Sequence, residues 1–271
     1  MAEYDPFQYM EKLYRSDLLQ KPLLGRIIET IGLPAGSRGL DAGCGVGLQM
    51  PLLTEAVGAA GHVTGLDILP EFIAEAGKNT VKWGLSDRTE LIQGDIFDPP
   101  FGDREFDWIW SASCACYSMQ RPLELLNRFQ RILKPGGLLL LAIWSAQQLL
   151  PGYPLLEAKL NATAAGIAPF KRGDRPEHHF LRLPGWMERA GFVDVRARPF
   201  SEGVCAPLSA PMRDALLSLI EMRWPKMQKE LRPPERRLYL RITDPSSPQF
   251  ILNLPGYYAF YTFTLFSAVR P

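Results

Sequence analysis

Cysteine is scarce in this chain, which also has almost no net charge and no long apolar run. Its 271 residues include four cysteines, too few for a disulfide scaffold, and a chain of this length buries its core without one. The longest apolar stretch, GGLLLLAIW at 136–144, is far shorter than the ~20 residues of a membrane-spanning helix. The first 20 residues carry charges throughout and contain no apolar signal core. We therefore expect a cytoplasmic protein with no membrane span.

The charges nearly cancel overall but are divided unevenly along the chain. Thirty basic residues stand against 29 acidic ones, whereas proteins that bind nucleic acid wholesale carry a basic surplus. Residues 1–145 hold 13 basic and 18 acidic side chains, and residues 146–271 hold 17 and 11. The stretch 223–241 contains seven basic and two acidic residues. We interpret it as a solvated face, and the alternative is a site for an anionic substrate or an RNA phosphate.

Segments typical of helices and strands alternate over the first 145 residues. Apolar residues at helical spacing predict a helix from Pro6 to Ile31, and the apolar run at 138–144 predicts a strand covered on both faces. The alternation favours an α/β fold with a doubly wound, mainly parallel sheet and helices on both faces. The expected strands are 38–43, 62–67, 89–95, 105–112 and 138–144, and the expected helices are 6–31, 47–59, 70–83 and 122–133.

The second half has fewer clear strands. We expect a helix that starts at residue 183 and stops at Gly191, a strand at 192–200, a helix around 211–230 and an aromatic, β-branched strand at 257–270. Segments inserted between late strands can cover the crevice at the strand ends. We therefore divide the chain into an N-terminal helical cap (1–34), a sheet domain (35–200 with 258–271), a lid insertion (201–257) and an additional lid segment (147–183).

The most informative segment is GLDAGCGVG at 39–47, which follows an expected strand and opens a helix. Its glycines allow a sharp turn and the close approach of a ligand. Asp67 ends the next strand, where a carboxylate can accept hydrogen bonds from both hydroxyls of a ribose. The third strand ends in Gly94, Asp95 and Ile96, which suit the amino edge and the face of an adenine. Because such strand ends meet in one crevice, the implied ligand contains an adenosine and a small charged tail.

Two common nucleotide-binding patterns are absent. No G-x-x-x-x-G-K-[ST] loop occurs, which argues against a phosphate-cradling ATPase. Leu48 stands where the third glycine of G-x-G-x-x-G should fall, which argues against a nicotinamide oxidoreductase. Asp41, two residues before the first glycine of the run, would repel a pyrophosphate and tolerate an ammonium group.

These features resemble the class I S-adenosylmethionine-dependent methyltransferases, and most closely the small-molecule methylases of quinone biosynthesis. The resemblance covers about residues 35–145 and rests on LDAGCGVG, the acidic end of the next strand, QGDIFDPPF, FDWIWSA and RILKPGGLLLLAIW. AGFVDV and FYTFTLFSAVR give weaker support. The resemblance implies a Rossmann-like, seven-stranded fold whose last strand, YTFTLFSAV, is antiparallel, so that the sheet domain binds the cofactor.

The resemblance also implies roles for individual residues. Gly43 and Gly45 would approach the methionine part of S-adenosyl-L-methionine, and Asp41 would lie near its ammonium group. Asp67 would hold the ribose hydroxyls, and Val46 stands where the family often has threonine or serine, so a side-chain bond is lost there. The adenine would lie between Asp95 and Ile96, and Ser111 or Ala112 would line the path to the sulfonium. The predicted cofactor-binding set is Asp41, Gly43, Cys44, Gly45, Asp67, Ile68, Gly94, Asp95, Ile96, Ser111 and Ala112.

Histidine and cysteine offer few further candidates. His178 and His179 are candidates for a catalytic general base because histidine titrates near neutral pH. The alternative is a solvent-exposed or locally hydrogen-bonded pair. Cys114 and Cys116 form a C-x-C without a second pair nearby, so we expect no metal site and expect both to pack behind the active site.

The sequence thus predicts an enzyme that moves a methyl group from S-adenosyl-L-methionine to an O, N or C atom of a small, largely apolar molecule. The transfer would be a direct displacement and would leave S-adenosyl-L-homocysteine. The aromatic residues and methionines of the lid segments suggest the apolar acceptor. Two alternatives are an RNA or protein methyltransferase that uses the basic second half, and a non-catalytic cofactor-binding protein of the same fold. We expect a monomer or homodimer without a nucleic-acid partner.

Overall fold

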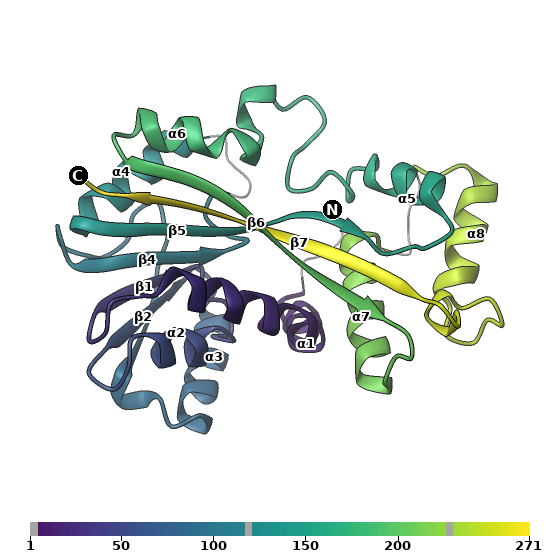
Figure 1. Ribbon diagram of the computed structural model, residues 1–271, viewed down its shortest axis with the longest axis horizontal. Helices are drawn as coiled ribbons and strands as arrows, with labels where there is room; N and C mark the ends of the chain where they lie inside the picture. The colour runs from purple at the N-terminus through teal and green to yellow at the C-terminus, as the bar shows by residue number, and fades with distance from the viewer. Residues whose placement is uncertain (1–4, 117–120, 226–229) are drawn as a thin grey trace.

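One seven-stranded sheet organises the chain, as the computed structural model of residues 5–116, 121–225 and 230–271 shows (Figure 1). The strands lie in the order β3-β2-β1-β4-β5-β7-β6. Neighbours from β3 to β5 are parallel, whereas β7 is antiparallel to both β5 and β6. The expected fold class, including the antiparallel last strand, is confirmed. The strands are β1 (Arg38–Ala42), β2 (His62–Asp67), β3 (Thr89–Gln93), β4 (Phe106–Ala112), β5 (Leu133–Gln148), β6 (Val193–Cys205) and β7 (Tyr258–Val269).

Helices cover both faces of this sheet (Figure 1). Side chains alternate between the faces along each strand, so Trp108 and Trp110 of β4 join the core beneath the N-terminal helix, whereas Ile109 joins the core on the opposite face. The helices are α1 (Pro6–Ile31), α2 (Met50–Ala56), α3 (Pro70–Lys82), α4 (Pro122–Ile132), α5 (Pro154–Asn161), α6 (Leu183–Arg189), α7 (Ala210–Arg223) and α8 (Pro233–Thr243). Asp5 caps the start of α1 by accepting hydrogen bonds from the backbone N–H groups of Phe7 and Gln8.

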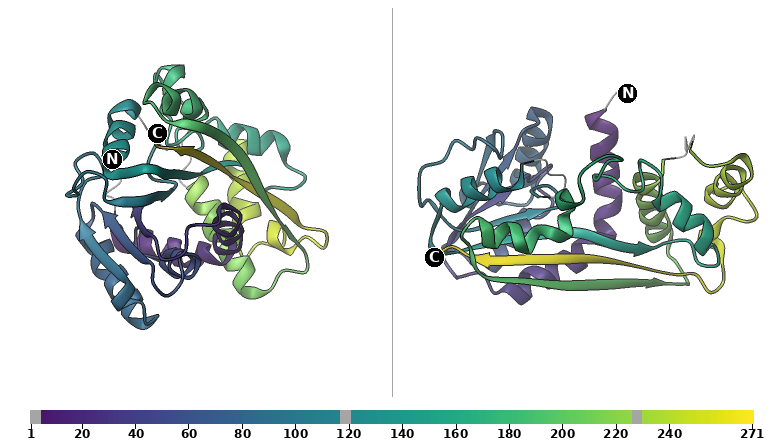
Figure 2. Two further views of the ribbon diagram at one scale, coloured as in Figure 1. Left: turned by 60° about the vertical axis from the view of Figure 1, so that its left-hand side comes forward. Right: turned by 90° about the horizontal axis from the view of Figure 1, so that it is seen from above.

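β5 and β6 are longer than the sequence suggests. β5 continues to Gln148, four residues past the expected end, and β6 continues to Cys205, so the first five residues of the predicted lid insertion belong to a strand. Aromatic contacts accompany the extension, since Trp144 stacks on Tyr261 at 5.1 Å between ring centroids and meets Phe263 edge-on. The extended strands lead from the body of the sheet to α5, α7 and α8 (Figure 2). Of these helices, α7 was predicted from the sequence, whereas α5 and α8 were not.

The segment after β5 is anchored at its start. The buried carboxylate of Glu157 in α5 accepts hydrogen bonds from the backbone N–H groups of Leu149 and Leu150, at 2.8 and 3.0 Å. The hydroxyl of Tyr257 donates to the carbonyl of Leu149 at 3.0 Å. These bonds fix the chain where it leaves the sheet, and so they position the helices beyond it.

Candidate active site

The turn between β1 and α2 is built from three glycines with left-handed backbone. Gly43, Gly45 and Gly47 have φ values of +82°, +55° and +78°. The position of Gly43 also excludes a side chain sterically, because a Cβ there would lie 2.2 Å from the Sγ of Cys114. The backbone N–H groups of Gly43 and Cys44 donate to the carbonyl of Leu66. The turn is therefore held against the end of β2.

Asp67, at the end of β2, is fixed by backbone donors. One carboxylate oxygen accepts a hydrogen bond from the N–H of Gly45 at 2.9 Å, and the other accepts from the N–H of Leu69 at 3.0 Å. The same carboxylate lines the cavity above the glycine turn. It can therefore meet hydroxyl groups of a ligand without moving far from its backbone partners.

Asp41 lies buried beneath this turn. Its side chain is 2% exposed, and its Oδ2 atom has no hydrogen-bond partner among the residues that the structure describes. Burial, together with the nearby charge of Asp67, raises the pKa of Asp41 to about 8. An unpaired buried carboxyl is costly, and a cationic group nearby would stabilise its ionised form.

A cavity of about 480 Å³, here named the inner cavity, lies above the glycine turn. Its lining comes from α1, from the turn with Asp67, from α3, from β5 and the end of β4, and from the C-terminal end of α7. The lining residues are Tyr9, Lys12, Leu13, Gln20, Gly43, Cys44, Gly45, Val46, Leu48, Gln49, Asp67, Phe72, Ala112, Ser113, Cys114, Trp144, Leu219, Glu221, Met222, Arg223 and Pro225.

A second cavity of about 380 Å³, the outer cavity, adjoins the inner one, and Trp144 and Arg223 line both. It is formed by β5 and by the segment that follows it. The lining residues are Trp144, Ser145, Ala146, Gln147, Asn161, Gly166, Ile167, Ala168, Pro169, Phe170, His179, Phe180 and Arg223.

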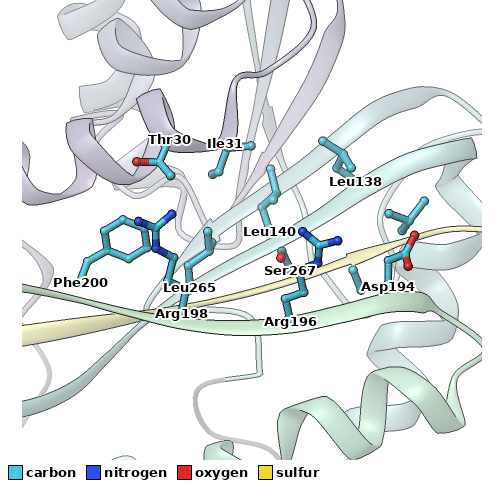
Figure 3. Close-up of a pocket in the computed structure, with 12 residues that line it drawn as sticks. Thr30, Ile31, Leu138, Leu140, Asp194, Arg196, Arg198, Phe200, Leu265 and Ser267 are labelled. Carbon is cyan, nitrogen blue, oxygen red and sulfur yellow. The ribbon is translucent and has the colours of Figure 1, made fainter.

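A third cavity, of about 350 Å³, shares no lining residue with the inner or the outer cavity (Figure 3). It lies between the C-terminal end of α1 and the β5-β7-β6 side of the sheet, where Leu138, Leu140 and Leu265 form an apolar floor beside Arg196 and Arg198. None of the predicted site residues lines it. The candidate site is therefore the pair of inner and outer cavities.

The predicted cofactor residues lie at or just after the carboxyl ends of the parallel strands, but only some of them line the inner cavity. Gly43, Cys44, Gly45, Asp67 and Ala112 line the inner cavity, with Asp41 buried below them. Gly94, Asp95, Ile96 and Ile68 follow the ends of β3 and β2 and do not line it.

Asp95 is exposed and accepts a hydrogen bond from the N–H of Phe97 at 2.9 Å. Its charge, with those of Asp67 and Asp41, adds to the burial that raises the pKa of Cys114 to about 12. Asp95 is therefore close enough to the thiol of Cys114 to act on it electrostatically.

Ser111 lies under the site and does not line either cavity. Its buried hydroxyl donates to the carbonyl of Ala42 at 2.6 Å and accepts from the N–H of Ala115 at 3.0 Å. This bonding ties β4 to β1 below the glycine turn. The neighbouring Ala112 has the opposite orientation in the strand and reaches the cavity.

The two candidate histidines lie in different surroundings. His178 contacts the guanidinium of Arg175 at 3.1 Å and lines neither cavity. His179 lines the outer cavity between the rings of Phe170 and Phe180, and burial lowers its pKa. Its Nδ1 accepts a hydrogen bond from the N–H of Leu181 at 3.3 Å, so the neutral ring carries its proton on Nε2. The structure therefore brings one of the two to the site.

The thiols at the site are protonated. Burial raises the pKa of Cys44 well above its ordinary value and also raises that of Cys116, so neither thiol is an active nucleophile. Within residues 5–116, 121–225 and 230–271, no three His, Cys, Asp or Glu side chains cluster in a way that could hold a metal ion.

Several cavity residues were not predicted from the sequence. Lys12 and Leu13 reach the inner cavity from α1, and Gln49 reaches it from the start of α2, where its Oε1 accepts from the indole N–H of Trp110. Arg223 comes from a stretch interpreted as a solvated face. No local pattern marks these residues, because their positions depend on how distant helices pack on the sheet.

Comparison with known proteins agrees with this architecture. A family model described as a methyltransferase domain matches residues 40–141. A demethylmenaquinone methyltransferase of Staphylococcus aureus is 30% identical over 193 residues, which cover 67% of this chain and 78% of that protein.

Two solved structures show the same fold. A SAM-dependent methyltransferase from Aquifex aeolicus has a TM-score of 0.54 at 18% identity, over 98% of this chain and 100% of that one. A Haemonchus contortus phosphoethanolamine N-methyltransferase, solved with S-adenosylhomocysteine, has a TM-score of 0.54 at 17% identity, over 92% of this chain and 52% of that one. Across the part of the chain with described coordinates, no helix is long and apolar enough to cross a membrane. With its glycine turn, its sheet order and these relatives, the chain belongs to the class I S-adenosylmethionine-dependent methyltransferases.

Proposed function

We propose that this enzyme methylates an O, N or C atom of a small, largely apolar molecule that enters through the outer cavity. The observation that carries the proposal is the arrangement of two adjoining cavities. The inner one has carboxylates at its base, and the outer one is walled by Trp144, Phe170 and Phe180. The name of the curated relative, a demethylmenaquinone methyltransferase, supports an acceptor that contains a ring.

The residues around the inner cavity fit S-adenosylmethionine. The buried, unpaired oxygen of Asp41 matches the cationic ammonium end of the methionine part. Gly43, Cys44 and Gly45 would pass along the methionine part, and the carboxylate of Asp67 would accept from the ribose hydroxyls. We propose that Ile68 and Gly94–Ile96 hold the adenine, and that Ala112, with Ser111 behind it, borders the reactive methyl.

When bound, the sulfonium would supply an activated methyl group, whose carbon is open to direct attack by a nucleophile with a neutral thioether as the leaving group. Positive charge disperses in such a transition state, so the protein contributes mainly by aligning the two reactants and excluding water. Trp144 is suited to this role because it lines both cavities and its ring is held in place by contacts with the rings of Tyr261 and Phe263. Its indole N–H donates to Gln147 at 2.5 Å, which fixes the ring orientation further.

The segments that line the two cavities also cover them. We propose that the cap (1–34) and the lid insertion (201–257) enclose the cofactor, because α1 and α7 both contribute to the inner cavity. The additional lid segment (147–183) would enclose the acceptor, because its residues form most of the outer cavity. Arg15 of α1 and Asp214 of α7 form an ion pair that joins the two covering helices.

We also propose that the enzyme works in the cytoplasm.

Of the two histidines, we propose that His179 meets the acceptor. In the tautomer described above, its Nε2–H is a donor, and the ring can accept a proton on Nδ1 only by giving up the bond from Leu181. We therefore propose that His179 donates a hydrogen bond to an acceptor oxygen. A base role for His178 or His179 stays a prediction.

The experiment that tests the proposal is transfer of a tritiated methyl group from S-adenosylmethionine to a panel of small ring-containing metabolites. Turnover of at least one small acceptor, with no transfer to RNA or protein substrates, is the expected result. Binding of the cofactor without transfer to any acceptor would favour a non-catalytic protein, and transfer confined to macromolecules would overturn the small-molecule proposal.

A further inference from the structure

The two cavities differ in whether acidic side chains line them. The inner cavity has Asp67 and Glu221, together with Lys12 and Arg223, in its lining and Asp41 beneath it. The outer cavity has no acidic side chain in its described lining, and Arg223 is the one residue there with a permanent charge. Among the described lining residues, acidic side chains are therefore confined to the inner cavity, and Arg223 lies where the two cavities meet.

Arg223 has unused hydrogen-bonding capacity. One terminal nitrogen of its guanidinium donates to the carbonyl of Gly166 at 3.1 Å, which holds the side chain against the loop that walls the outer cavity. Its Nε–H is buried and has no partner in the part of the chain that the structure describes, and no carboxylate there lies within ion-pair distance of it. A buried cationic donor without an anion is unfavourable, and an anionic ligand would relieve the cost.

Two further donors accompany Arg223 in the outer cavity. The Oδ1 atom of Asn161 accepts from the Trp224 indole N–H at 3.2 Å and from the Gln147 amide at 3.3 Å. Because an indole N–H can only donate, this bonding fixes the orientation of the Asn161 amide, whose NH₂ group has no partner among the described residues. His179 adds the Nε2–H of its neutral ring. The polar groups left for a ligand are therefore donors.

We propose that the outer cavity binds an anionic oxygen of the methyl acceptor, as in an aromatic carboxylate, and that Arg223 is the residue that selects it. This inference rests on the proposed function and adds the class of acceptor. The aromatic walls at Trp144, Phe170 and Phe180 take the ring, and the donors of Arg223, Asn161 and His179 surround the anionic oxygen. Arg223 also lines the inner cavity, so an acceptor held by it lies beside the position of the reactive methyl.

The test compares 2-naphthoate with its uncharged analogue 2-naphthamide, titrated into the full chain saturated with S-adenosylhomocysteine. Tryptophan fluorescence reports binding, since Trp144 lines the site. We expect wild-type protein to bind the carboxylate about tenfold more tightly than the amide, as a charged hydrogen bond does. In Arg223→Met this preference falls to about twofold or less, and in Arg223→Lys part of it returns.

The matched control is Arg213→Met, which removes the same charge from the same helix but outside both cavities. Arg213 bonds to the carbonyl of Leu208 and to Asn253. We expect this variant to keep the wild-type preference. Equal binding of the two probes by wild-type protein, binding of neither, or an unchanged preference in Arg223→Met would overturn the inference.

Binding of S-adenosylhomocysteine, measured on the same samples, separates this inference from the proposed function. Intact nucleoside binding without a carboxylate preference overturns the acidic acceptor alone. If the wild-type protein does not bind S-adenosylhomocysteine, the proposed function is overturned as well.

Discussion

At the scale of single residues, the glycine turn is the most constrained feature of the site. Gly43 combines a left-handed backbone with a position where any Cβ would strike Cys114. Gly84, after α3, has a similar φ of +68° but nothing within 4 Å of its missing Cβ. The pair therefore separates the backbone cost of an alanine from the steric cost.

We predict that Gly84→Ala destabilises the protein by about 1–2 kcal/mol, the cost of placing an L-residue in left-handed backbone. Gly43→Ala should cost a further ~1–3 kcal/mol because Cys114 must move. It should also weaken cofactor binding, whereas Gly84→Ala should not. Denaturant unfolding and calorimetric titration measure the two effects. Equal destabilisation by both substitutions would show that the contact with Cys114 is not tight.

Asp41 makes the stability of the cofactor-free protein depend on pH. Its pKa is raised to about 8 in the folded state, against 3.8 for an ordinary aspartate, so between these values the folded chain binds more protons than the unfolded chain. This group therefore lowers stability progressively as pH rises from about 4 to about 8.

The variant Asp41→Asn removes the titration and keeps the shape of the protonated side chain. We predict that wild-type and variant differ little in unfolding free energy near pH 4, and that the variant becomes increasingly more stable up to about pH 8. Thermal unfolding at a series of pH values measures this difference. A difference that does not change with pH would contradict the raised pKa of Asp41.

At the scale of elements, Asn79 joins three parts of the site. Its amide, on α3, donates to the carbonyl of Val46 in the glycine turn at 2.8 Å and to the hydroxyl of Tyr14 on α1 at 2.6 Å. The Tyr14 hydroxyl in turn donates to Glu75 at 3.0 Å. One buried side chain thus links the covering helix α1 to the glycine turn.

We predict that Asn79→Ala destabilises the fold by about 1–3 kcal/mol, because it leaves the Val46 carbonyl without its donor, and that it weakens cofactor binding. Tyr14→Phe is the matched control, since it removes the link to α1 and leaves the link to the turn. It should cost only about 0.5–1.5 kcal/mol and affect cofactor binding less. Calorimetric titration decides, and an equal loss of affinity in both variants would place the effect in α1 and not in the turn.

Elements also differ in how far the sequence predicts them. The segments around LDAGCGVG and VTGLD carry local signals, and the strands, the turn and Asp67 lie where those signals indicate. The place of Ser111 depends on strand parity, which directs Ala112 to the cavity and Ser111 beneath it. The extensions of β5 and β6 depend on pairing with β7, more than 50 residues further on, and no local pattern shows it.

At the scale of the whole molecule, the uneven distribution of charge along the chain can be related to the charged residues at the two cavities. The acidic first half supplies Asp41 and Asp67 to the inner cavity, and the basic second half supplies Arg223, which lines both cavities. Elsewhere in the basic stretch, Arg232 pairs with Glu235 at the start of α8. Sequence composition shows the asymmetry, but only the packing of α7 against the sheet brings Arg223 to the site.

We propose that the strand ends at Asp41 and Asp67 together hold one S-adenosyl nucleoside. Calorimetric titration of the full chain with S-adenosylhomocysteine tests it most directly, with Asp67→Ala and the nearby exposed Glu71→Ala as matched variants. We predict one bound nucleoside per chain with a Kd below about 1 mM, a loss of about 2 kcal/mol or roughly 30-fold in Asp67→Ala, and wild-type affinity in Glu71→Ala. Absence of binding by the wild-type chain, or equal affinity of wild type and Asp67→Ala, would contradict the account.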